Sequence, residues 1–149
     1  MTQCPNQRRL LLTALALAPL AALLRPRTAL GADGAALGLK GYDVVAYFDE
    51  GKPRLGLPEH QMDWDERRYQ FNGPRHKALF AENPERYLPQ FAGFCAVGVS
   101  MGKKVVADPT VWKIVDGRLY VFSSPKALEM AEKDPELLKR SQQNWSSGK

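Results

Sequence analysis

The sequence predicts an α+β fold, a small antiparallel sheet with helices packed on it, made of two pseudo-repeated hairpin–helix units. One observation is that Tyr69-x-Phe71 and Tyr120-x-Phe122 each place two aromatic residues on one face of a strand. A second is that Pro74 and Pro125 follow these strands, and proline is favoured at the first position of a helix. A third is Asp116-Gly117 before the second strand, which is a strong hairpin signal.

The repeat continues without a gap through the helices. Aligned with it are Arg75 and Lys126, Leu79 and Met130, Asn83 and Asp134, Pro84 and Pro135, and Glu85 and Glu136. Lengthening the turn after Trp112 also aligns Trp64 with Trp112, so each unit is predicted to begin with a tryptophan-led strand. Ser124 is expected to cap the second helix. The last helix, from Pro135 toward Trp145, is expected to be the longest.

The remaining segments of the domain are predicted from local composition. The β-branched and aromatic run over residues 41–48 predicts a first strand, and residues 55–60 are expected to form a loop. Residues 91–104 lie between the two copies and mix strand-type residues with three glycines, which permit close backbone approach.

The N-terminal segment has the pattern of a cleavable signal peptide over residues 1–31. Arg8 and Arg9 precede a short apolar run that ends at Arg25, and the run falls short of the roughly 20 residues that a spanning helix needs. An uncleaved membrane anchor is the alternative. The arginine pair also resembles a twin-arginine signal, so both the twin-arginine (Tat) and the general secretory (Sec) route stay open. Residues 32–39 are predicted to be a flexible tether, and residues 40–149 the domain.

We expect the protein to be exported to the periplasm, and removal of the leader changes both the net charge and the number of cysteines of the mature protein. The chain has 21 basic and 16 acidic residues, a formal net charge of +5. Arg8, Arg9, Arg25 and Arg27 fall in the leader, so the mature part is nearly neutral and gives no reason to expect nucleic acid as a partner. Cys4 also falls in the leader, which leaves Cys95 as the only cysteine of the mature protein. It is either buried and inert, or free and functional.

Cys95 and His76 are the candidate functional residues. A reactive thiol needs nearby positive charge and exposure, and Lys103 and Lys104 are close in sequence. Thiolate and imidazole are the soft and borderline ligands that copper and zinc accept. No C-x-x-C or H-x₃-H spacing is present, so no closed zinc site is encoded locally. A packed cysteine and a surface histidine are the alternatives.

Several segments together resemble the YHS domain family, closest to its exported, single-domain branch in which the cysteine is sometimes selenocysteine. The matching segments span residues 40 to about 145. They include Gly41-Tyr42-Asp43-x-Val45-Ala46-Tyr47-Phe48, Phe80-x-x-Asn83-Pro84-Glu85-x-Tyr87, Gly93-Phe94-Cys95-Ala96-x-Gly98-Val99-Ser100-x-Gly102-Lys103-Lys104 and Asp108-Pro109 with Trp112. The cysteine segment is the most specific of them.

The resemblance implies a small α+β domain with a suspected role in handling copper or zinc, and no demonstrated reaction. Two features depart from the family pattern. The cysteine pair of many YHS domains is absent, so a cysteine-pair metal site is not carried over, and Val44 replaces the usual proline. Only Cys95 carries over as a candidate functional residue.

Three hypotheses about function follow. The first is a non-enzymatic exported module that binds a soft metal or a redox-active group through Cys95, aided by His76. The second is a thiol redox enzyme with Cys95 as the nucleophile. The third is a scaffold that binds an exported partner protein and in which Cys95 is merely packed.

Overall fold

The computed structural model describes residues 35–148, and within this range the chain has an α+β fold with two small sheets and six α-helices. The signal peptide predicted over residues 1–31 lies outside the described residues. In chain order the elements are β1 (Ala36–Leu37), η1 (Gly38–Gly41), α1 (Ala46–Asp49), β2 (Leu57–Trp64), β3 (Arg67–Phe71), α2 (Pro74–Glu82), α3 (Pro84–Tyr87), η2 (Gln90–Gly93), α4 (Ala96–Ser100), β4 (Asp108–Val115), β5 (Arg118–Phe122), α5 (Pro125–Lys133) and α6 (Leu137–Ser146).

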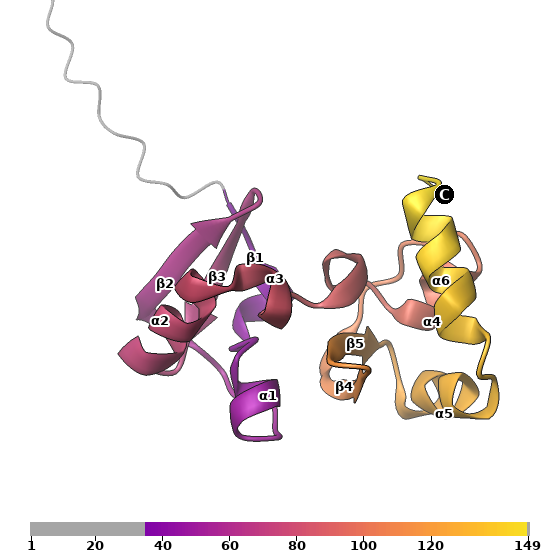
Figure 1. Ribbon diagram of the computed structural model, residues 1–149, viewed down its shortest axis with the longest axis horizontal. Helices are drawn as coiled ribbons and strands as arrows, with labels where there is room; N and C mark the ends of the chain where they lie inside the picture. Colours follow the sequence, from indigo (N-terminus) through magenta and orange to yellow (C-terminus); the bar gives the residue numbers. More distant parts are fainter. Residues whose placement is uncertain (1–34, 149) are drawn as a thin grey trace, which may run out of the picture. The chain divides into compact units, whose positions relative to one another are not determined.

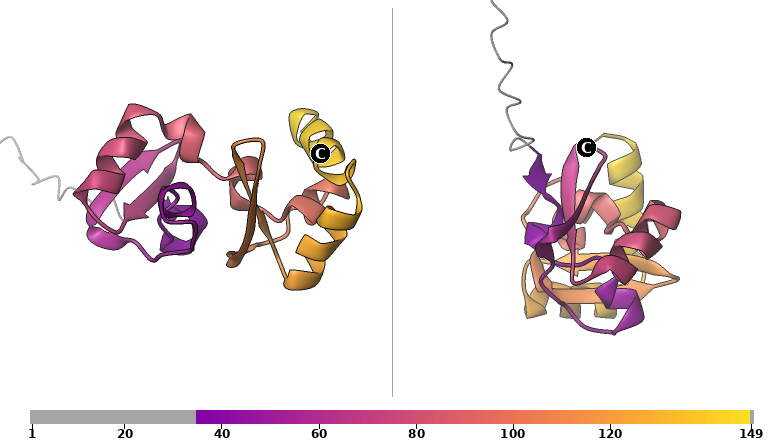
Figure 2. Two further views of the ribbon diagram at one scale, coloured as in Figure 1. Left: turned by 60° about the horizontal axis from the view of Figure 1, so that its bottom comes forward. Right: turned by 90° about the vertical axis from the view of Figure 1, so that its left-hand side faces the viewer.

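Each half of the domain contains one antiparallel hairpin followed by two helices, as the repeat predicts. In the first half the sheet order is β1-β3-β2, with β1 parallel to β3, and α2 and α3 follow. In the second half β4 pairs with β5, and α5 and α6 follow. Figures 1 and 2 show the first-half elements, coloured indigo to magenta, gathered apart from the second-half elements, coloured orange to yellow. One small antiparallel sheet was expected, and the structure has two sheets, one of them mixed.

The repeat extends further toward the N-terminus than the sequence alignment. Tyr42 forms an isolated antiparallel bridge with Leu55, and Phe94 forms the same bridge with Val106. One residue further on, the N–H of Asp43 donates to the carbonyl of Arg54, and that of Cys95 donates to Val105, both at 2.8 Å. Residues 91–104 therefore do not separate the two copies. They open the second copy, and η2 and α4 correspond to η1 and α1.

The strand predicted over residues 41–48 is wrong, because this run contains helix α1. Val44, Val45, Ala46 and Tyr47 are at most 1% exposed. A run that is buried on every side carries no periodicity that separates strand from helix. Asp43 stabilises the helix, because its carboxylate accepts hydrogen bonds from two backbone N–H groups in the first turn.

Three smaller expectations also need correction. Trp64 does not correspond to Trp112. The turns of the two hairpins have the same length, with Trp64 paired to Arg67 in the first and Val115 paired to Arg118 in the second. The counterpart of Trp64 is therefore Val115. The expected loop over residues 55–60 contains the start of β2 at Leu57. The expected tether over residues 32–39 is structured from residue 36 onward, because β1 pairs with β3 and Leu39 is only 6% exposed.

The helix starts agree with the sequence. Pro74 and Pro125 occupy the first turns of α2 and α5, and the hydroxyl of Ser124 accepts the N–H of Ala127. Asn83 caps α3 by accepting the N–H of Arg86. Helix α6 is the longest described helix but begins at Leu137 rather than Pro135.

A single core joins the two halves. The hydroxyl of Tyr47 donates to the carbonyl of Pro109 at 2.8 Å, and the rings of Tyr47 and Trp112 meet edge to face with centroids 5.1 Å apart. Pro89 pairs with Leu119 in an isolated parallel bridge, which is the second-half counterpart of the β1–β3 pairing. No described helix is long and apolar enough to cross a bilayer.

Candidate functional site

Cys95 lies immediately before α4 and inside the core. Its side chain is 1% exposed, its N–H donates to Val105, and its carbonyl accepts the N–H of Val99 at 3.0 Å. Lys104, one of the two lysines expected to supply positive charge, instead lies over the ring of Trp145, 5.7 Å from its centroid. In the described conformation the thiol lacks the exposure that reactive cysteines share.

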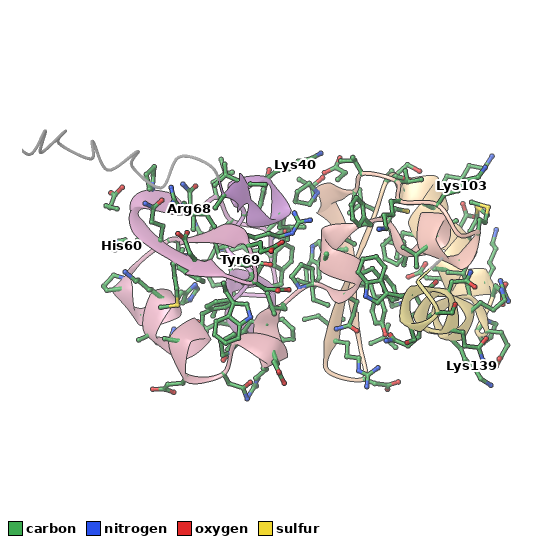
Figure 3. All side chains as sticks on the ribbon, turned by 90° about the horizontal axis from the view of Figure 1, so that it is seen from above. Lys40, His60, Arg68, Tyr69, Lys103 and Lys139 are labelled. Atoms are coloured by element: carbon green, nitrogen blue, oxygen red, sulfur yellow. The ribbon has the colours of Figure 1, made fainter. Side chains whose placement is uncertain are left out.

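His76 is buried in α2 between two carboxylates. Its side chain is 5% exposed, with Nδ1 2.7 Å from Oδ2 of Asp43 and Nε2 3.2 Å from Oδ2 of Asp49. Carboxylate oxygens only accept hydrogen bonds, so both contacts are hydrogen bonds when both ring nitrogens carry a proton. The geometry therefore suits an imidazolium ion held between two anions. The other histidine, His60, lies in β2 at the far end of the domain from Lys103 (Figure 3).

Asp43 is the centre of this polar cluster. It is fully buried. Its Oδ1 accepts the N–H groups of Val45 at 2.9 Å and Ala46 at 3.3 Å, and its Oδ2 accepts the N–H of Asn72 at 2.8 Å and faces His76. One carboxylate thus fixes the start of α1, the end of β3 and the first turn of α2.

Asp49 connects the cluster to solvent. Arg75 holds it with two hydrogen bonds, of 2.6 and 3.1 Å, in the paired geometry that suits a guanidinium and a carboxylate. The hydrogen bond from Arg75 and then that from His76 lower the pKa of Asp49 from 3.8 to about 2. The outer carboxylate therefore stays ionised over the physiological range.

The structure does not bring Cys95 and His76 together. Helix α2 packs on β2, β3 and α3, whereas α4 packs on α5, α6, β5 and η2. In the repeat Cys95 takes the place of Asp43, and Ala127 takes the place of His76. No group of three or more His, Cys, Asp or Glu side chains in the described part of the chain is arranged to hold a metal ion. Metal binding by Cys95 and His76 stays a prediction.

Sequence reasoning missed Asp43 and Asp49. The signal for Asp43 was present, because Gly41-Tyr42-Asp43-x-Val45 aligns with Gly93-Phe94-Cys95-x-Val97. That alignment places an ionisable side chain in both copies at the same position. Nothing in the sequence pairs Asp43 with His76, because the contact depends on how α2 returns past α1.

Two left-handed turns are a further feature that the sequence did not reveal. Leu39 and Lys40 in η1 have φ of 45° and 54°, and Phe91 and Ala92 in η2 have φ of 58° and 51°. Each such residue with a side chain costs roughly 1–2 kcal/mol. The same unfavourable turn occurs at the equivalent place in both halves, so the surrounding structure imposes it.

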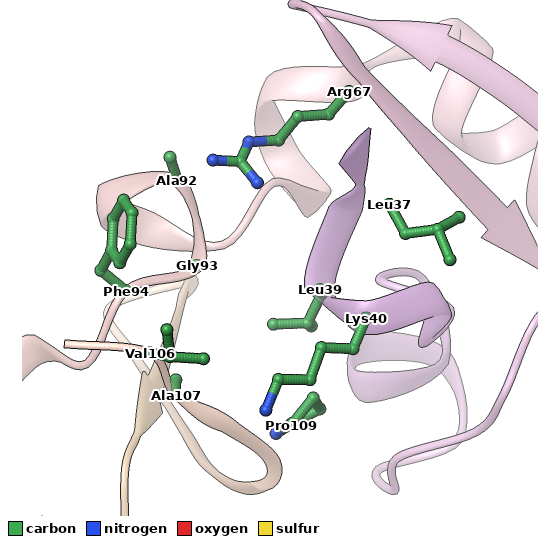
Figure 4. A pocket seen from close by; sticks show the side chains of 10 residues that line it. All are labelled: Leu37, Leu39, Lys40, Arg67, Ala92, Gly93, Phe94, Val106, Ala107 and Pro109. Atoms are coloured by element: carbon green, nitrogen blue, oxygen red, sulfur yellow. The ribbon is translucent and has the colours of Figure 1, made fainter. Parts of the chain in front are cut away.

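A cavity of about 130 Å³ lies between the two turns. Leu39 and Lys40 line it on one side, and Ala92 and Gly93 line it on the other (Figure 4). The guanidinium of Arg67 reaches across toward Ala92 in the same view. The junction of the two halves therefore combines strained backbone, open space and positive charge.

Comparison with protein-family models, with curated proteins and with solved structures finds no match for this chain. The resemblance to the YHS family accordingly stays a prediction from the residues.

Proposed function

We propose that the chain is an exported accessory module of the YHS type that binds a ligand or a partner protein and in which Cys95 is a packed core residue. The observation that carries the proposal is the environment of the thiol. Cys95 is 1% exposed and belongs to the core shared by both halves. A free cysteine in such surroundings behaves as a small hydrophobic residue.

Thiol accessibility tests this proposal. We expect Cys95 to react slowly with a chromogenic disulfide reagent in the folded protein and at the ordinary rate in urea. A matched control is Cys95→Ala combined with Met101→Cys, because Met101 is 58% exposed and its thiol should react at once. Native Cys95 that reacts as fast as this control would overturn the packed assignment.

A soft-metal module, for copper or zinc, or a redox module acting through Cys95 is the second candidate, and one observation favours it. The equivalent residue, Asp43, is a buried anion that accepts backbone N–H groups at a helix start. A thiolate at Cys95 would occupy the corresponding position before α4. Copper(I) titration of wild type, Cys95→Ser and His76→Ala decides between the candidates. Equal binding by wild type and Cys95→Ser rejects the metal function through this thiol.

Export is part of the proposal and has its own test. The N-terminus of protein recovered from the periplasm should begin after Gly31 or Ala32, as the leader pattern predicts. Lysine substitution of both Arg8 and Arg9 should stop export if the route is the twin-arginine one and should leave it intact if the route is the general secretory one. Full-length protein retained at the membrane would contradict cleavage.

A further inference from the structure

A second cavity, of about 260 Å³, lies beside the one between the turns and is formed by β3, η2 and α6. The residues that matter in its lining are Asp65, Arg67, Tyr69, Phe91, Gln142 and Trp145. Its volume falls just below the roughly 300–1,000 Å³ of sites for drug-sized molecules. It therefore suits a ligand about as large as one amino acid.

The lining contains an acceptor without a partner. Oε1 of Gln142 is the one buried side-chain oxygen or nitrogen within residues 35–148 that has no hydrogen bond. Buried polar atoms are nearly always paired, so this acceptor is available to a donor from outside the chain, either a water molecule or a ligand.

The lining also contains a positive charge that makes no ion pair with any described residue. Arg67 takes part in none of the ion pairs found among the described residues. It is partly buried and lines both cavities at the junction of the halves. A guanidinium presents two parallel N–H donors that match a carboxylate.

Aromatic rings also line the cavity. Phe91 and Trp145 lie with ring centroids 5.8 Å apart, and Tyr69 is 3% exposed. Burial raises the pKa of Tyr69 to about 12, so its hydroxyl stays neutral. Phe91 has a φ of 58°, and strained residues of this kind gather at ligand sites.

We propose that this cavity binds a small α-amino carboxylate with an apolar side chain, either a free amino acid or the C-terminal residue of a peptide. The carboxylate pairs with Arg67, the N–H on the α-carbon donates to Oε1 of Gln142, and the side chain packs against Phe91 and Trp145. Asp65 at the rim disfavours a second negative charge on the ligand. This inference rests on the proposed binding function and names its ligand.

Four probes test the ligand chemistry. N-acetyl-L-phenylalanine represents a peptide C-terminus and L-phenylalanine a free amino acid. N-acetyl-L-phenylalanine amide lacks the carboxylate, and 3-phenylpropanoate lacks the N–H. Amide-resolved NMR titration should show saturable shifts around the cavity for one or both acids, with a Kd in the millimolar range or below. The amide and 3-phenylpropanoate should bind at least about tenfold more weakly. Whichever acids bind identify the source of the ligand.

Variants assign the binding to this cavity. Arg67→Gln should weaken binding at least about tenfold, whereas Arg118→Gln, at the equivalent place in the second hairpin, should change it less than twofold. Gln142→Leu should weaken binding, whereas Gln143→Leu on the exposed side of α6 should not. Without ligand, Gln142→Leu should unfold at the same temperature as wild type or higher, because it removes an unpaired acceptor.

The proposal is overturned if neither acid binds saturably at 20 mM, if Arg67→Gln binds as wild type does, or if Gln142→Leu unfolds at a lower temperature. Failure of the packed-thiol proposal is a separate result. A fast-reacting Cys95 with unchanged amino-acid binding removes the packed assignment and leaves the cavity assignment in place.

Discussion

Replacing Asp43 with asparagine should be among the most destabilising conservative substitutions in the domain. Asn keeps the size of the side chain but replaces one acceptor oxygen with a donor, and Asp43 receives hydrogen bonds on both oxygens. The new amide NH₂ group must then face other donors. These are either the backbone N–H groups at the start of α1, or the ring of His76 and the N–H of Asn72. His76 would also lose its fully buried counterion. Breaking one partner of a buried ion pair costs about 3–5 kcal/mol, and loss of a helix cap alone costs about 1 kcal/mol. We expect a loss of about 3–5 kcal/mol.

Urea unfolding followed by tryptophan fluorescence measures this loss. The matched control is Asp63→Asn, because Asp63 makes a paired hydrogen bond with Arg68 but its side chain is 53% exposed. Exposed ion pairs contribute about 0–1 kcal/mol, so the control should stay near wild type. A double-mutant cycle with His76→Gln should give a coupling energy of about 1–3 kcal/mol. A loss no larger than that of the control, or a coupling energy near zero, would refute the reasoning.

Two further predictions concern pH and packing. Arg75 and the buried imidazole hold the pKa of Asp49 near 2, below its unfolded value, so the unfolded chain binds more protons and stability falls as pH drops from about 4 to 2. Unfolding of Asp49→Asn, measured at each pH, should be less dependent on pH in that window, and an unchanged profile would contradict the assignment. Gly98→Ala should lower stability by about 1–3 kcal/mol, because the added Cβ would lie 2.7 Å from Cγ2 of Val105. Gly73→Ala is its control in the same melts, since a Cβ there meets nothing within 4 Å, and equal effects would count against the packing argument.

The parts of the fold that follow from sequence are those with local causes. Pro74 and Pro125 begin helices because proline lacks the N–H that a first turn leaves unpaired. Asp116-Gly117 gives a tight hairpin because both residues adopt positive φ. Helix α1 could not be predicted in this way, since its residues are buried on all sides and a buried run suits either a strand or a helix.

The candidate sites depend on contacts between distant segments, and sequence reasoning found them only in part. It selected His76 but not its partner, because Asp43 lies far away in sequence and pairs only when α2 packs beside α1. It selected Cys95 but could not decide its burial, which follows from the packing of α4 on α6 and β5. The cavities also escaped it, because Arg67 and Gln142 converge only through the junction of the two halves.

The differences between the two halves explain why the junction is the better place to look for binding. In the first half the position of Asp43 supports a polar cluster that ties three elements together. In the second half Cys95 and Ala127 occupy the equivalent positions as buried apolar groups. Both arrangements stabilise the fold. The hydrogen bonds of Asp43 lie within the first half, and those of the Cys95 backbone lie within the second. Within residues 35–148, the guanidinium of Arg67 makes no ion pair and Oε1 of Gln142 makes no hydrogen bond, and the two residues come from opposite halves to line one cavity. The junction itself is held by the shared core and by the contacts of Tyr47 with Pro109 and Trp112. The cavity beside it brings the acceptor of Gln142 and the guanidinium of Arg67 into one lining, and the ligand that we propose would pair with both.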